Sequence, residues 1–260
     1  MTYLELGTEK LVAEVEGTIG WITFDHPERH NALSNEMQRA LPRAFDAFQR
    51  DDDVRVVVMR GAGDKAFISG ADISEFDDGL PGAGMSRSSD DELAPLEKPL
   101  VAMIQGYCIG GGVAVSLGAD IRIAADDAQF AIPAARLGVG YPFFGVKALV
   151  DLVGPAHASE ILFSARRYSA DEALGLGLVN RVVAKAELEA AVRELAGQIA
   201  DNAPLTVRAS KFAIAQAVRD PGTRDLDTAN ALVEACFESD DYREGVAAFL
   251  EKRPPRFRGR

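Results

Sequence analysis

Hydrophobic residues alternate with polar ones, or gather in short runs, over the first half of the chain. Leu11–Val15 and Ile19–Phe24 have the alternating pattern of short strands, and Gly17-Thr18 predicts the turn that joins them. Continuous apolar runs rich in β-branched residues are typical of buried strands. They occur at Val54–Met59, Leu100–Ile104 and Asp120–Ala124.

Helical periodicity appears first at Asn35–Gln49, where Ser34 is a suitable N-cap. Its apolar stripe consists of Met37, Leu41, Phe45 and Phe48. From Lys185 onward the pattern predicts helices, with breaks near residues 202–204 and 220–222. We therefore expect an α/β core in residues 1–200 and a helical C-terminal region in residues 201–260. The Gly-, Pro-, Ser- and Asp-rich residues 77–92 predict a surface loop or lid.

Composition narrows the possible functions. The net charge of −12 argues against a general nucleic-acid binder, because phosphate neutralisation requires a cationic face. No apolar run is as long as a membrane span, and residues 1–10 contain no signal-peptide core. We expect a cytoplasmic protein without membrane or nucleic-acid partners. We also expect no metal, because Cys108 and Cys236 form no motif and Pro27 interrupts the one pair of nearby histidines, His26 and His30.

The first segment that can carry chemistry is Gly106–Val115. We expect the chain here to leave a buried strand, pass through the glycine triplet 110–112 and enter an apolar helix. Glycine allows a ligand to approach the backbone closely, and the start of a helix has uncommitted N–H donors. The Gly-Lys-Ser/Thr of a phosphate-binding loop is missing. A glycine triplet can also serve only tight packing of a strand against a helix.

A second segment, Lys65–Ile73, also follows a buried strand and turns through Gly70 toward a short helix. Two such turns can place two N–H donors about 3 Å from one carbonyl oxygen. Together they indicate a site that stabilises a developing oxyanion.

Several ordered motifs make the chain resemble the crotonase (enoyl-CoA hydratase/isomerase) family nearly from end to end. They are His26–Leu33, Phe67–Ile73, Gly110–Gly112, Asp120–Ala124, Ala173–Val183 and Ser239–Arg253. The resemblance implies a spiral of ββα units, a CoA thioester as substrate and no permanently bound cofactor. It also implies a homo-oligomer, either a trimer or a dimer of trimers, with residues 201–260 as its oligomerisation region.

The resemblance also implies roles for particular residues. The backbone N–H groups of Ala71 and Gly111 would form the oxyanion hole. The residues expected to contact CoA are Arg29 near the nucleotide phosphates, Ser69, Ala71, Asp72 and Ile73 beside the adenine, and Phe249 and Lys252 reaching it from a neighbouring subunit.

The chain departs from the family where hydration chemistry is expected. Hydratases of the family use two glutamates, and the matching positions here are Ala114 and Ala134. Dienoyl isomerases use an acidic residue near the position of Pro142. A methyl group cannot act as a general acid or base, and losing one positioned proton donor costs about 10²–10⁴ in rate. Orthodox hydration is therefore not expected.

Tyr141 is the leading candidate for a replacement. A methylmalonyl-CoA decarboxylase-like branch has a tyrosine at the matching place, although Ala71 and Pro133 stand where that branch uses a histidine and a threonine. Decarboxylation needs no base, because loss of CO₂ generates the enolate directly. Tyr141 can equally be a wall residue with a bonded hydroxyl.

Other roles stay open. Arg136 can pair with a substrate carboxylate or form a surface ion pair, and Glu75 can swing toward the site. Asp72 and Asp120 have the character of turn or cap carboxylates. The basic ending, residues 252–260, is either a solvated terminus or a contact for CoA. The alternative to an enzyme is a non-catalytic protein that binds acyl-CoA.

Overall fold

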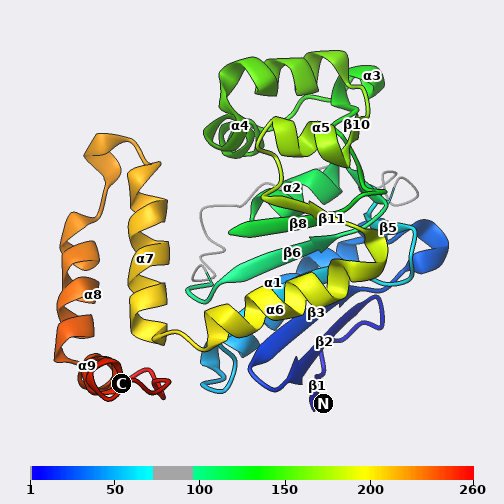
Figure 1. Ribbon diagram of the computed structural model, residues 1–260. Coiled ribbons are helices and arrows are strands. Elements are labelled where there is room, and N and C mark those ends of the chain that lie inside the picture. Colours follow the sequence, from blue (N-terminus) through cyan, green and yellow to red (C-terminus); the bar gives the residue numbers. More distant parts are fainter. Residues whose placement is uncertain (1, 73–95) are drawn as a thin grey trace.

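The computed structural model describes residues 2–72 and 96–260, and two β-sheets organise this part of the chain (Figure 1). The larger sheet has the order β1-β2-β3-β4-β6-β8-β11. Its strands are β1 (Thr2–Leu4), β2 (Leu11–Glu16), β3 (Ile19–Phe24), β4 (Val56–Gly61), β6 (Leu100–Ile104), β8 (Ile121–Ala125) and β11 (Arg181–Val183). Pairing is antiparallel from β1 to β3 and parallel from β3 to β11.

A smaller sheet has the order β10-β9-β7-β5. Its strands are β5 (Ala66–Ile68), β7 (Tyr107–Ile109), β9 (Gln129–Ala131) and β10 (Tyr168–Ser169). Each parallel strand of this sheet follows one of the larger sheet along the chain, so that β4 leads to β5, β6 to β7 and β8 to β9. The chain thus winds between the sheets as the expected spiral of ββα units.

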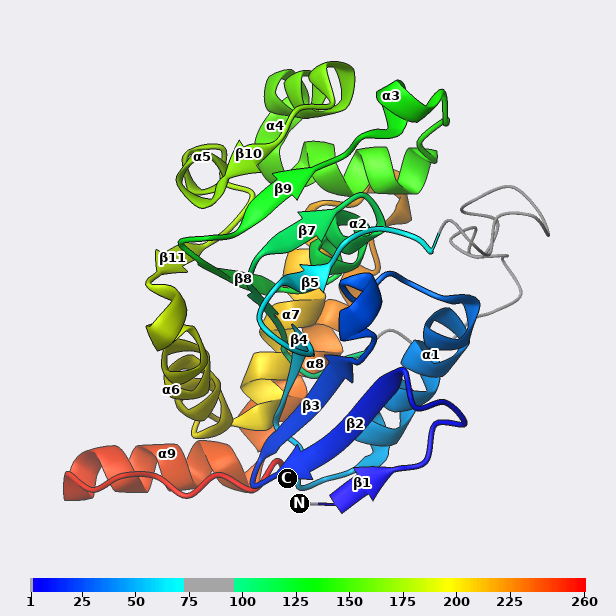
Figure 2. The ribbon, with the colours of Figure 1, turned by 90° about the vertical axis from the view of Figure 1, so that its right-hand side faces the viewer.

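Helices cover both faces of the larger sheet and cap the smaller one (Figures 1 and 2). They are α1 (Asn35–Arg50), α2 (Gly111–Leu117), α3 (Ala134–Leu137), α4 (Phe143–Ser164), α5 (Ala170–Gly175), α6 (Leu188–Ala200), α7 (Pro204–Ala217), α8 (Leu226–Glu238) and α9 (Asp240–Glu251). Short 3-10 turns lie at Pro27–Arg29, Lys185–Glu187 and Pro221–Thr223. Helices α7, α8 and α9 extend from one side of the sheets in Figure 1.

Alternation along the strands explains how α1 and α6 dock. On β4, Val57 and Met59 point into the core that includes α1, whereas Val56 and Val58 pack in a second core with α6. A buried strand must be apolar on both faces, which is why this segment is a continuous hydrophobic run. Trp21 of β3 is fully buried in the second core.

The patterns located α1 and the longer strands closely but did not predict α4. The strand predictions for β2, β3 and β6 and the α1 prediction agree with the structure to within one residue, and the Ser34 hydroxyl caps α1 by accepting a hydrogen bond from the Met37 amide. The strands predicted at 54–59 and 120–124 lie two and one residues further along, at β4 and β8. As expected, the segment 106–115 leaves a strand through the glycine triplet and enters a helix, although that strand, β7, is a separate short one that the pattern did not predict.

No helix within residues 2–72 or 96–260 combines the length and apolar character needed to cross a membrane. The described residues also contain no group of three or more His, Cys, Asp or Glu side chains arranged to hold a metal ion. The expected loop at residues 77–92 lies outside the described residues.

Candidate oxyanion site

Two glycine turns meet at the end of the smaller sheet, where β5 and β7 run parallel. After β5 the chain turns at Gly70, whose φ of 125° favours glycine, and continues to Ala71. After β7 it turns at Gly110 with φ 52° and ψ −109°, and α2 begins at Gly111. Because the strands are neighbours, the two turns are neighbours too. A methyl group on Gly111 would lie 3.6 Å from the Ala71 amide nitrogen.

The orientation of the Ala71 amide follows from a bridge to Leu33. The Leu33 amide donates to the Gly70 carbonyl oxygen at 2.8 Å, and the Asp72 amide donates to the Leu33 carbonyl oxygen at 2.9 Å. In this parallel bridge the N–H and C=O of Ala71 itself point away from Leu33. Ala71 therefore directs its N–H to the side that Leu33 does not occupy.

Neither amide is committed within the described part of the chain. No hydrogen bond between described residues uses the N–H of Ala71 or of Gly111 as its donor. The first N–H groups of a helix have no intrahelical partner, which explains Gly111, and the bridge geometry explains Ala71. Since a half-buried amide gains from a partner, two adjacent free donors are suited to an oxygen atom of a ligand.

Glycine at 112 is required by packing. A methyl group there would overlap the carbonyl oxygen of Ile68 on β5. The close approach keeps the start of α2 against the strand that leads to Ala71. Gly112 thus serves tight packing, and the Gly111 amide has no partner among the described residues, so its role in a site stays a prediction.

The turn that carries Arg29 lies next to Ser69. The Ser69 hydroxyl donates to the Arg29 carbonyl oxygen at 3.3 Å, and the Ser69 amide donates to the His30 carbonyl oxygen at 3.1 Å. The Arg29 side chain is exposed, and Asp72 is buried. The structure therefore brings Arg29, Ser69, Ala71 and Asp72 together, while Ile73 and Glu75 lie outside the described residues.

Sequence reasoning did not single out Asn31, which holds this turn in place. It is fully buried, and its side-chain amide donates to the carbonyl oxygens of Ala62 and Ala66, both at 2.9 Å. Its side-chain oxygen accepts from the His26 amide at 3.0 Å. The position of Asn31 inside the motif 26–33 was the only signal in the sequence for this role. The two carbonyl groups that its side-chain amide binds, those of Ala62 and Ala66, lie more than thirty residues further along the chain.

The two positions expected to carry catalytic carboxylates flank the same region. Ala114 lies in the first turns of α2, and Ala134 begins α3. Pro133, just before Ala134, lies close to Gly110: a methyl group on Gly110 would be 3.9 Å from its Cδ. The site thus has the backbone arrangement for binding an oxyanion, but methyl groups at both positions.

Tyr141 packs against Gly145 at the start of α4, and its hydroxyl oxygen is buried without a hydrogen-bond partner among the described residues. Burial, together with the nearby Cys108, raises the pKa of Tyr141 to about 12. Tyr141 was expected either to take part in catalysis or to be a wall residue whose hydroxyl is hydrogen-bonded. Among the described residues its hydroxyl has no such hydrogen bond. Because an orphaned hydroxyl is costly, a partner supplied by a ligand would be favourable.

Cys108 and Ser116 are core residues. Cys108 on β7 is fully buried, and desolvation raises the pKa of its thiol to about 12, so it is not a reactive thiolate. The Ser116 hydroxyl donates to the carbonyl oxygen of Val113.

Asp120 accepts hydrogen bonds from the Leu100 amide and from Lys211, as a structural carboxylate does. Arg136 is exposed, and no ion pair joins it to a described residue.

Phe249 and Lys252 lie far from these turns. Phe249 is 84% exposed on α9, and Lys252 ends this helix in a left-handed conformation. Figures 1 and 2 place α9 well away from α2 in both directions of view. Within one chain, these two residues and the free amides are therefore not brought together.

Comparison with known proteins shows which family the chain is similar to. The family model described as enoyl-CoA hydratase/isomerase matches residues 14–260. The chain is similar to the short-chain-enoyl-CoA hydratase of Clostridium acetobutylicum, with 36% identity over 94% of this chain and 95% of that protein. It is 34% identical to the crotonyl-CoA hydratase of Syntrophomonas wolfei over 96% of this chain and 98% of that one.

Among solved structures, the enoyl-CoA hydratase of Mycobacterium tuberculosis H37Rv superimposes with a TM-score of 0.86. Its identity to this chain is 30%, and the match covers 97% of this chain and 100% of that structure. The similarity thus extends over nearly the whole length of the chain and includes the fold. This protein belongs to the enoyl-CoA hydratase/isomerase family, the crotonases, and is an enzyme of that family.

Proposed function

We propose that the protein acts on an acyl-CoA or enoyl-CoA thioester through an enolate whose oxygen is bound by the amides of Ala71 and Gly111. The observation that carries this proposal is the adjacency of two uncommitted N–H groups at the ends of β5 and β7. Preorganised donors of this kind stabilise the charge that develops on a thioester oxygen, and removing one such donor costs about 10²–10³ in rate in other enzymes.

The CoA part of the substrate has a suitable place beside these amides. Arg29 is exposed and free to meet the nucleotide phosphates, and Ser69 and Asp72 border the same turn. CoA enters and leaves as part of the substrate, so no permanently bound cofactor is required. Ile73 belongs to the same proposed set by its position in the sequence.

Phe249 and Lys252 would contact CoA from a second copy of the chain, since α9 lies away from α2 in its own chain. This supports a homo-oligomer, a trimer or a dimer of trimers, in which α9 of one chain reaches the site of another. The exposed apolar side chains of α9, such as Phe249 and Leu250, are consistent with burial in such an assembly.

The proton chemistry differs from that of a hydratase. Hydration requires a base to activate water, and Ala114 and Ala134 cannot supply one. The raised pKa of Tyr141 keeps its hydroxyl protonated at neutral pH. Tyr141 is therefore suited to donate a hydrogen bond or a proton, and unsuited to remove one.

This favours one second candidate, decarboxylation of a malonyl-type CoA thioester. The bond between the α-carbon and the carboxylate breaks, CO₂ leaves, and the electron pair moves onto the thioester oxygen held by Ala71 and Gly111. No base takes part, and the enolate then accepts a proton at the α-carbon. Tyr141 would orient the carboxylate or supply that proton, and exposed Arg136 can approach the same carboxylate.

A panel of thioesters in D₂O tests the proposal. The purified protein is incubated with acyl-, enoyl- and malonyl-type CoA esters, and products and α-deuterium are followed by mass spectrometry. We expect α-deuteration, and CO₂ release from a malonyl-type ester that slows in Tyr141→Phe. Hydration of crotonyl-CoA at ordinary enzymatic rates would contradict our interpretation of Ala114 and Ala134. Binding of CoA esters without any exchange or turnover would instead identify a non-catalytic binder.

A further inference from the structure

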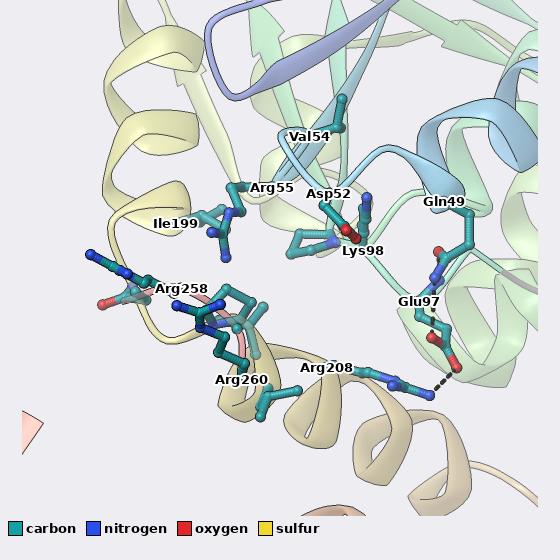
Figure 3. A pocket seen from close by; sticks show the side chains of 16 residues that line it. Gln49, Asp52, Val54, Arg55, Glu97, Lys98, Ile199, Arg208, Arg258 and Arg260 are labelled. Carbon is teal, nitrogen blue, oxygen red and sulfur yellow. Dashed lines mark hydrogen bonds and ion pairs between the residues drawn. The ribbon is translucent and has the colours of Figure 1, made fainter. Parts of the chain in front are cut away.

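A cavity of about 560 Å³ lies between the larger sheet, α7 and the end of the chain (Figure 3). Its wall includes residues that immediately precede two parallel strands: Arg55 before β4, and Lys98 and Pro99 before β6. The other ends of these strands lead toward Ala71 and Gly111. The cavity is therefore at the opposite edge of the sheet from the thioester site, and it is within the size range of small-molecule sites.

Cations dominate this wall. Arg55, Lys98, Arg208, Arg258 and Arg260 line the cavity together with two acids, Asp52 and Glu97. A chain with a net charge of −12 has thus placed five of its cations around one space.

The two acids already have cationic neighbours. Glu97 forms an ion pair with Arg208 at 2.8 Å and accepts a hydrogen bond from the side chain of Gln49. Asp52 interacts electrostatically with Lys98, whose ammonium group donates to the carbonyl oxygens of Phe48 and Asp51. Figure 3 shows the Glu97 group on one side of the cavity and the remaining arginines on the other.

Arg55, Arg258 and Arg260 remain without a carboxylate. In the described part of the chain, none of the three forms an ion pair. Arg253, in the same basic ending, is neutralised by Glu244 through two hydrogen bonds. Only part of the basic ending is thus neutralised by the protein itself.

The backbone that carries these arginines is held firmly. The buried carboxylate of Asp241 accepts hydrogen bonds from the amides of Arg258 and Gly259 at 2.6 and 2.7 Å. The Arg260 carbonyl oxygen accepts from the amides of Asp240 and Asp241. A methyl group on Gly259 would lie 3.4 Å from Nη1 of Arg55, so the Arg55 guanidinium packs beside the residue between the two other arginines.

Arg55 packs against the segment that carries Arg258 and Arg260, and cations that line one cavity repel one another unless an anion lies among them. Phosphate matches them best, because a guanidinium group donates two parallel hydrogen bonds to phosphate oxygens. We propose that this cavity, which we call the arginine pocket, binds the phosphate groups of a small molecule with two or more phosphates. The site is additional to the thioester site, and its ligand joins the sheet, α7 and the C-terminal segment.

Titration calorimetry with pyrophosphate at low ionic strength tests the proposal on the full chain. We expect one saturable site per chain, and a loss of affinity of about tenfold or more in each of Arg55→Gln, Arg258→Gln and Arg260→Gln. Arg256→Gln is the matched control, because it removes the same charge from the same segment at a residue outside the cavity wall. Its affinity for pyrophosphate should change by less than about twofold.

A thermal shift measurement checks the same variants. A ligand that binds only the folded chain raises the unfolding temperature, so pyrophosphate should stabilise the wild type and Arg256→Gln but not Arg258→Gln. Arg258 and Arg260 are exposed, and their replacement leaves the core intact. Absence of saturable binding, or equal weakening in Arg256→Gln and Arg258→Gln, would overturn the proposal. A third outcome would also overturn it: the wild type binds no pyrophosphate, and the oligomeric mass changes in Arg258→Gln. In that case the arginines would serve a contact between subunits.

Two further ligands distinguish the possible sources of the phosphates. ADP and CoA are titrated in the Arg29→Gln background, which weakens the proposed nucleotide contact at the thioester site. If only ADP displaces pyrophosphate from the arginine pocket of this variant, the ligand class is a free nucleotide. If CoA displaces pyrophosphate as well, the pocket recognises the phosphates of CoA itself. Either result supports the arginine pocket, and loss of pyrophosphate binding in Arg29→Gln would assign that binding to the thioester site instead.

Discussion

The guanidinium group of Arg122 donates a hydrogen bond to the carbonyl oxygen of Ser116, 3.2 Å away, near the end of the helix that begins with Gly111. The same buried side chain donates to the carbonyl oxygens of Ala119 and Leu178, at 2.6 and 2.9 Å. The last carbonyl groups of a helix have no intrahelical partner, and a cation there is favourable. Arg122 thus fixes the far end of the helix whose first amide belongs to the candidate site.

Replacing Arg122 by methionine should lower the free energy of unfolding by about 2–4 kcal/mol, because it leaves buried carbonyl groups without donors. Turnover should fall as well, since α2 also carries Gly111. Chemical denaturation measures the first effect. Arg136→Met is the control: this arginine is exposed on α3, and its loss should change stability by no more than about 0.5 kcal/mol. Equal stability of both variants would show that the hydrogen bonds of Arg122 contribute little.

Gly112→Ala should disrupt the contact between α2 and β5, because the added methyl group overlaps the carbonyl oxygen of Ile68. We expect a loss of about 3 kcal/mol or more in unfolding free energy, together with loss of turnover. Gly175→Ala is the matched control. Gly175 is helical with no atom within 4 Å of the added methyl group, so this change should be neutral or stabilise by about 0.5–1 kcal/mol. Thermal or denaturant unfolding of the two variants separates the cases.

Introducing glutamate at both Ala114 and Ala134 should create crotonyl-CoA hydration. The proposed oxyanion hole consists of backbone groups, so it is retained when these side chains change. Two positioned carboxylates would then supply the missing acid and base, with an expected gain of about 10²-fold or more over the wild type. Loss of absorbance of the enoyl thioester follows the reaction. Ala114→Gln with Ala134→Gln provides the control of similar size, and a gain in this pair as well would rule out acid–base chemistry as the cause.

The phenol of Tyr141 should titrate near pH 12, against about 10 in the unfolded chain. Between these values the folded state holds a proton that the unfolded state has lost, so stability falls as pH rises through this window. Below pH 10 the contribution of Tyr141 is constant. The tyrosinate absorbance near 295 nm, compared between wild type and Tyr141→Phe, measures this titration. A difference curve centred near pH 10 would contradict the buried environment of the hydroxyl.

The sequence predicted several of the longer elements, because each contains enough positions for a period to show, but it did not predict α4, the 22-residue helix. Helix α1 and strands β2, β3 and β6 follow their hydrophobic patterns, and the breaks around α7 lie where proline and glycine occur. Strands of two or three residues, such as β5, β7 and β10, have too few positions for any period. The smaller sheet, which positions both glycine turns, was therefore not anticipated strand by strand.

The candidate site, too, could be predicted from the sequence only in part. The motifs pointed to Ala71 and Gly111 by number, and the alanines at 114 and 134 are visible without any structure. The direction of the Ala71 amide was not visible, because it depends on the bridge with Leu33, which is distant in the sequence. Hydrogen-bond direction is a property of two strands together and not of either one.

By itself, the sequence determined the family, the positions of α1 and the longer strands, and the absence of carboxylates at two decisive positions, because these are properties of local pattern and residue identity. Within the described residues, the tertiary structure decided which amides lack a partner, that the Tyr141 hydroxyl is orphaned, and that Arg55, Arg258 and Arg260 line one cavity. The physical reason is that partners, burial and repulsion arise between residues that only folding brings together. About two hundred positions separate Arg55 from Arg258, and no local pattern connects them.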